Sequence, residues 1–158
     1  MTLLEWKDEY RTGFSSIDYE HQTMIESINQ IFKDSGGDKE TLLAALGEIQ
    51  ALIEAHFALE EKIMRDQRYA AYIPHKQDHE RLLDEILDIM DAVEKNGEND
   101  TANALGERLS AWFGIHFASF DKDLHTLIKW LINQLVNLNG KQADIQAEAG
   151  MIMSNKTL

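Results

Sequence analysis

The chain has 158 residues, of which 44% are hydrophobic and 27% are charged, as expected for one soluble globular domain. Its formal net charge of −13, with no basic stripe to offset it, argues against binding to nucleic acid. The absence of cysteine excludes disulfides, zinc–thiolate sites, iron–sulfur clusters and thiol catalysis.

The first part of the chain predicts an N-terminal arm followed by two helices. The arm, residues 1–17, lacks clear periodicity, and the aromatic residues that we expect to pack it onto the body are Trp6, Tyr10 and Phe14. Apolar residues recur at helical spacing from about residue 18 to 33 and again from about 39 to 65. Residues 35–38 between them read as a turn, in which Asp38 is a candidate helix cap.

Two further helices are expected in the second part. The third extends to about Lys95, and a polar turn at residues 96–100 separates it from a last helix that extends to about Leu138. Four amphipathic helices with short connections predict an all-α, up-down-up-down four-helix bundle. We therefore expect a domain at residues 1–138. Residues 139–158 are polar, and a frayed tail, an extra helix or the start of a linker all remain open.

No membrane attachment is expected. The first eight residues lack the basic start and apolar stretch of a signal peptide. The most apolar region, residues 124–138, is too short and too interrupted by polar side chains to span a bilayer. These features predict a cytoplasmic protein.

Histidines and carboxylates form a spaced series along the four predicted helices. The pattern is His21, then His56-x-x-x-Glu60, then His75-x-x-x-His79, then His116-x-x-x-x-Asp121. Residues four apart share one face of a helix, and the whole series lies within apolar stripes. Burying these groups unpaired is costly, and metal coordination satisfies them. Five imidazoles and two carboxylates exceed the needs of one ion, so the series predicts two.

The last pair in the series has an awkward spacing. Side chains five apart on a regular helix, with about 3.6 residues per turn, point about 140° apart. A one-turn π-bulge brings them closer to one face, and such bulges often occur at functional sites. We therefore predict an irregular helix at residues 116–121.

The ligand types narrow the choice of metal. Imidazole and carboxylate without thiolate suit iron, zinc, copper or manganese, and seven ligands for two ions fit a di-iron centre best. Having only two carboxylates stabilises the ferrous state, which favours reversible oxygen binding over oxygen cleavage. For the sixth histidine, His125, a surface or outer position is favoured over a ligand role.

With these residues in view, the chain resembles the bacterial hemerythrins over about residues 5–135. The resemblance includes Trp6 and Gly13, and it covers all seven metal-ligand positions through the segments Ile17–Gln22, His56–Glu61, His75–His79 and Trp112–Asp121. One departure is Pro74, directly before His75, where many relatives have a Tyr-Pro pair several residues earlier. Because proline is tolerated only in the first turn of a helix, the third helix should begin near Ile73.

The resemblance implies the role of each ligand. One iron would be held by His75, His79 and His116, and the other by His21 and His56. Glu60 and Asp121 would bridge both, together with an oxo or hydroxo group derived from solvent. The second iron then keeps one open position, where dioxygen binds reversibly. Candidate residues for an apolar pocket around it are Ile25, Leu52, Ile53, Trp112, Phe113 and Phe120.

Three functions are compared on this basis. The favoured one is a non-enzymatic di-iron protein that binds dioxygen for storage, delivery or sensing, and a sensor would need a signalling partner or output domain beyond residue 138. The alternative is a di-iron enzyme, namely an oxidase, peroxidase or nitric-oxide reductase, although the sequence contains no dedicated proton-relay motif. A purely structural metal site is disfavoured, because the ligand set leaves a position open.

Overall fold

The computed structural model describes residues 2–35, 38–96 and 101–154, and in these ranges every regular element is helical. The elements are the 3₁₀-helix η1 (Asp8–Tyr10), α1 (Ser15–Asp34), α2 (Lys39–Asp66), α3 (Tyr72–Asn96), α4 (Thr101–His116), the π-helix η2 (Phe117–Asp121) and α5 (Lys122–Ser154). The predicted helices are confirmed, and their starts fall within a few residues of the expected ones. Residues 36–37 and 97–100 of the two predicted turns lie outside the described residues.

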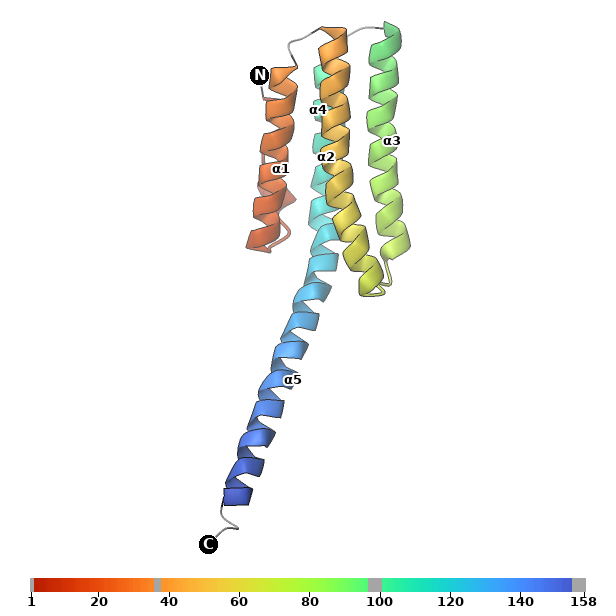
Figure 1. Cartoon of the computed structure of the whole chain (residues 1–158). Helices are drawn as coiled ribbons and strands as arrows, with labels where there is room; N and C mark the ends of the chain where they lie inside the picture. Colours follow the sequence, from red (N-terminus) through yellow and green to blue (C-terminus); the bar gives the residue numbers. More distant parts are fainter. Residues whose placement is uncertain (1, 36–37, 97–100, 155–158) are drawn as a thin grey trace. The chain divides into compact units, whose positions relative to one another are not determined.

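The first four helices form the predicted bundle. Helix α2 packs against both α1 and α3, and α3 also packs against α4. Figure 1 shows α1, α2 and α3 side by side and α4 behind α2, with successive helices running in opposite directions. The fold is therefore an up-down-up-down four-helix bundle, as the apolar periodicity predicted.

Helix α2 shows why the chain folds in this way. Its buried residues recur every three or four positions, so they form one continuous stripe: Leu42, Leu46, Ile49, Ile53, Phe57, Glu60 and Met64. The helix begins at the predicted cap, where the side chain of Asp38 accepts a hydrogen bond from the backbone N–H of Thr41 at 3.0 Å. The same stripe that fills the core therefore carries a carboxylate into it.

One described helix, α2, is long and apolar enough to cross a membrane by length and composition alone. It is not the 124–138 segment that the sequence singled out as the most apolar. The buried stripe of α2 is part of the core of the bundle. Packing within the bundle thus accounts for this stripe.

The N-terminal arm packs onto the bundle, as predicted. Element η1 contacts α4, and the ring of Tyr10 is fully buried and lies nearly perpendicular to the ring of Trp6. The arm also pairs with α1, because Asn29 exchanges two hydrogen bonds of 2.8 Å with the backbone of Leu4. Close approach to α4 requires Gly106, where a Cβ atom would lie 2.9 Å from the carbonyl oxygen of Leu3.

Replacing Tyr10 with phenylalanine should lower the free energy of unfolding by about 1 kcal/mol. The Tyr10 hydroxyl lies 2.8 Å from Ser110 Oγ and donates to the Ser110 carbonyl at 3.2 Å, and the variant removes both of these partly buried contacts. Urea unfolding measures the change. The matched control is Tyr19→Phe, at a ring that is 70% exposed, where stability should change by less than about 0.5 kcal/mol. Equal stabilities of the two variants would contradict this role.

The last helix is longer than predicted. Helix α5 continues to Ser154, so residues 139–154 are helical, and the remaining residues 155–158 lie outside the described part. The residues after Lys122 form a compact unit of their own, separate from Met1–Lys122. The domain boundary at residue 138 stays a prediction.

Candidate metal centre

Four helices and one irregular segment contribute side chains to a buried cluster. His21 comes from α1, the pair His56 and Glu60 from α2, and the pair His75 and His79 from α3. His116 ends α4 and Asp121 ends η2. Six of these seven side chains are buried and His56 is partly exposed. The structure thus brings together all seven residues that the sequence predicted as ligands.

The larger of two groups in this cluster contains three histidines. The Nε2 atom of His116 lies 3.2 Å from the Nε2 atoms of both His75 and His79. Glu60 Oε2 lies 3.3 Å from His79 Nε2, and Asp121 Oδ1 lies 3.0 Å from His116 Nε2. Three ring nitrogens and two carboxylate oxygens therefore converge on one small volume.

The smaller group contains the other two histidines. His21 Nε2 lies 3.3 Å from Asp121 Oδ2, and His56 Nε2 lies 3.7 Å from Glu60 Oε1. In each of the two groups, all the potential ligand atoms lie within 4.8 Å of one another. His125 belongs to neither group.

The two carboxylates are common to both groups. Glu60 presents Oε2 to the three-histidine group and Oε1 to His56. Asp121 likewise presents Oδ1 to His116 and Oδ2 to His21. Each carboxylate therefore has one oxygen on each side, which is the arrangement that a bridging ligand requires.

The predicted helix irregularity is confirmed at the last pair of residues. Residues Phe117–Asp121 form a π-helix between two α-helices. Its wider turn compensates for the five-residue spacing, so His116 and Asp121 both face the cluster, with Nε2 and Oδ1 3.0 Å apart. The backbone irregularity is thus what brings this carboxylate to the histidines.

The placement of His75 after a proline is also accommodated. Helix α3 begins at Tyr72, one residue before the predicted start, so Pro74 lies in the first turn, where its missing N–H is not needed. The backbone N–H of His75 donates to the carbonyl of Ala71 at 3.1 Å. The departure from the usual family pattern therefore leaves His75 in the three-histidine group.

The donor set fits a transition metal. It contains imidazoles and carboxylates and no sulfur, which suits divalent transition metals. The buried Nε2 atom of His56 has no hydrogen-bond partner among the described residues, and a metal ion would satisfy it. The residues present therefore suit metal binding better than a network of hydrogen bonds.

Comparison with known proteins agrees with this geometry. Residues 12–135 match the family described as the hemerythrin HHE cation binding domain. The chain belongs to the hemerythrin family. Its relatives there are oxygen-binding proteins rather than enzymes, which agrees with the expected non-enzymatic role, and the family binds non-heme iron.

The bacterial relatives match most of the chain, and a hemerythrin subunit matches about half of it. Bacteriohemerythrin from Pseudomonas aeruginosa (strain LESB58) is 27% identical over 139 residues, which is 86% of this chain and 88% of the relative. The bacteriohemerythrin of Stenotrophomonas maltophilia (strain R551-3) is 25% identical over 85% of this chain and 87% of its own length. Hemerythrin subunit 1 of Golfingia vulgaris is 30% identical over 51% of this chain and 66% of its own. No solved structure shows significant similarity to the chain.

Aromatic rings stack on three histidines of this hemerythrin-family cluster. Phe117 lies parallel to His21 at 3.7 Å between centroids, Phe57 parallel to His79 at 3.8 Å, and Trp112 against His116 at 3.9 Å. Of the predicted pocket residues, Trp112 and Phe120 contact ligand rings and Phe113 stacks on Phe117. Phe57 and Phe117 were missed, although each directly follows a ligand histidine in the sequence. Stacked rings fix the orientation of the imidazoles and exclude water.

Two carboxylates behind the histidines were also missed as functional residues. Asp78 Oδ2 lies 2.7 Å from His116 Nδ1, and Glu61 Oε1 lies 3.4 Å from His79 Nδ1. Asp78 and Glu61 are each adjacent in sequence to a predicted ligand. Adjacency in sequence, however, does not indicate which residue of a neighbouring helix a side chain will contact. The contact between Asp78 and His116 depends on how α3 packs against α4, so the sequence alone does not predict it.

The metal-free cluster is strongly polarised. Burial alone would lower the pKa of His116, but the carboxylates of Asp121, Asp78 and Glu60 together outweigh this effect and raise the pKa to about 9. Burial would raise the pKa of Asp121, but the charge and hydrogen bond of His116 hold it well below its usual range. The two groups thus form an ion pair in the metal-free protein, and a metal ion that binds His116 at neutral pH must displace a proton.

Proposed function

We propose that this chain binds two iron ions and, through them, dioxygen reversibly, without catalysing its conversion. One observation carries the proposal: the two carboxylates Glu60 and Asp121 each face both histidine groups. A site for a single ion has no use for that arrangement. Shared carboxylates are what a pair of ions needs to be bridged.

The donor count supports an unequal pair of sites. His75, His79 and His116 would bind one ion, while His21 and His56 would bind the other. Glu60, Asp121 and a bridging oxo or hydroxo group would complete both. The second ion then has one protein ligand fewer, which leaves it a position for dioxygen. The pair of iron ions would together supply the two electrons that dioxygen takes on binding and would recover them on release.

The surroundings of the cluster suit a carrier. The stacked rings of Phe57, Trp112 and Phe117 are buried, so they keep water from the ligand atoms. A dry and apolar surround slows loss of bound oxygen to solvent. The cytoplasmic location, and any output domain beyond residue 138, stay predictions.

An optical titration tests this function. Protein loaded with ferrous iron under nitrogen should develop a charge-transfer band on exposure to air and lose it when oxygen is removed, over repeated cycles. The His56→Ala variant, which removes a histidine of the smaller group, should not cycle. A band that forms once and never reverses, or turnover of peroxide or nitric oxide beyond one equivalent per site, would contradict reversible binding and favour the enzyme.

A further inference from the structure

A buried chain of polar contacts links His116 to the surface. The carboxylate of Asp78 is only 6% exposed, and its Oδ2 atom lies 2.7 Å from Nδ1 of His116. Its other oxygen, Oδ1, accepts a hydrogen bond from Arg81 one turn further along α3. The contacts therefore run from the guanidinium of Arg81 through Asp78 to His116.

The hydrogen bond of Asp78 determines which nitrogen of His116 is available. Because the carboxylate of Asp78 accepts a hydrogen bond from Nδ1 of His116, that nitrogen keeps its proton, and the proton that a metal ion displaces is the one on Nε2. That Nε2 atom faces His75 and His79 at 3.2 Å each. We propose that Asp78 is a positioning residue that orients His116 and strengthens it as a metal donor, and that Arg81 limits this effect by sharing the charge of Asp78.

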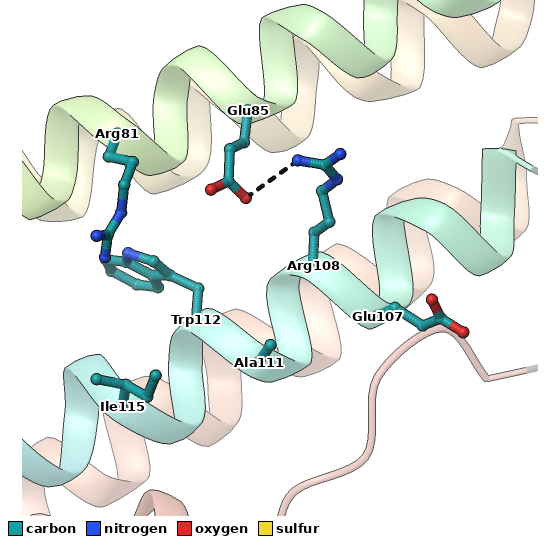
Figure 2. A pocket seen from close by; sticks show the side chains of 7 residues that line it. All are labelled: Arg81, Glu85, Glu107, Arg108, Ala111, Trp112 and Ile115. Carbon is teal, nitrogen blue, oxygen red and sulfur yellow. Dashed lines mark ion pairs between the residues drawn. The ribbon is translucent and has the colours of Figure 1, made fainter.

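Arg81 connects the Arg81–Asp78–His116 chain of contacts to a cavity at the surface. Together with Trp112 and Arg108 it lines a cavity of about 460 Å³ between α3 and α4. Figure 2 shows Arg81 and Glu85 on α3 opposite Arg108 and Trp112 on α4. Trp112 in turn stacks on His116 at 3.9 Å, so two lining residues of this cavity are connected to the same ligand. The electronic state of His116 is thus sensitive to charge in this cavity.

A second ligand histidine, His79, also has a carboxylate behind its Nδ1 atom, at a longer distance. Glu61 approaches Nδ1 of His79 at 3.4 Å, and its charge is shared with Arg65 at 3.5 Å and Lys76 at 3.9 Å. The bond at His116 is 2.7 Å long and more deeply buried, so it should contribute more. Glu61 therefore provides an internal comparison for Asp78.

Zinc dissociation tests the positioning role without requiring oxygen chemistry. Protein loaded with zinc is mixed with a chelator, and the rate of metal loss is followed. Asp78→Asn should accelerate loss at least about tenfold, because outer partners of ligand histidines typically contribute about 10- to 100-fold in affinity. Glu61→Gln should have a smaller effect. The charge-matched control Asp88→Asn, at an exposed position of α3, should leave the rate unchanged.

The reduction potential of the iron-loaded protein distinguishes electronic tuning from mere support of the fold. Asp78→Asn removes a negative charge behind His116 and should raise the potential, whereas Arg81→Gln frees that charge and should lower it. Arg108→Gln removes the same charge from the same cavity, where Arg108 pairs with Glu85 at 3.6 Å, and should shift the potential less. Shifts of the same sign for Asp78→Asn and Arg81→Gln, or zinc loss from Asp78→Asn no faster than from Asp88→Asn, would overturn the proposal.

This inference rests on the metal-binding part of the proposed function, and the two can fail separately. Wild-type protein that holds zinc and iron but does not bind oxygen reversibly would reject the carrier and leave the role of Asp78 testable. Wild-type protein that cycles with oxygen, while Asp78→Asn loses zinc at the wild-type rate, would reject the positioning role alone. Thermal unfolding of the metal-free variants shows whether the fold is intact.

Discussion

Replacing Asp121 with asparagine should reduce the bound iron from two ions per chain to about one or fewer. Asp121 contributes one oxygen to each histidine group, at 3.0 Å from His116 Nε2 and 3.3 Å from His21 Nε2. The amide is neutral and a poor bridging ligand, so both ions lose an anionic donor at once. Elemental analysis of purified, iron-loaded protein measures the result.

Asp123→Asn provides the control for the Asp121 variant. It makes the same chemical change two residues further on, at an exposed position in the first turn of α5. Full iron content is expected there. If Asp121→Asn also retained two ions per chain, Asp121 would not be a shared ligand and the two-ion interpretation would lose its main support.

Replacing Phe117 with alanine should lower the free energy of unfolding by about 3 to 5 kcal/mol. The side chain is fully buried and stacks on both Phe113 and His21. Its ring also meets Tyr10 edge to face at 6.1 Å between centroids, so the variant opens a cavity where the arm, α1 and η2 meet. Denaturant unfolding of the metal-free protein measures the loss.

The control for the Phe117 variant is Ile115→Ala, two residues earlier and 65% exposed. It should change stability by less than about 0.5 kcal/mol. Because Phe117 also stacks on a proposed ligand, its variant should additionally lose iron faster than the Ile115 variant. A loss of stability below about 1 kcal/mol would mean that the surrounding residues do not depend on this ring.

Much of the bundle could be predicted, because it depends on periodicity along single helices. The buried stripe of α2 repeats every three or four residues, which already identifies the helix and its inner face. The π-helix at Phe117–Asp121 could be predicted for a similar reason. A five-residue spacing between two groups that must meet is incompatible with a regular helix.

Contacts between helices were harder to predict. Nothing in the order of residues indicates that Asp78 reaches across to His116 while its neighbour His79 faces the cluster, because this depends on how α3 packs against α4. The stacking of Phe57 on His79 likewise joins α2 and α3. The length of α5 was underestimated because its polar last part lacks an apolar stripe, although a helix can continue without one.

A crystal structure of the iron-loaded protein, with anomalous scattering recorded at the iron edge, is the most direct test of the central claim. We expect two iron peaks per chain, one beside His75, His79 and His116 and the other beside His21 and His56. Glu60 and Asp121 should each contact both peaks. A single peak, or two peaks that share neither carboxylate, would contradict the di-iron centre on which the proposed oxygen binding depends.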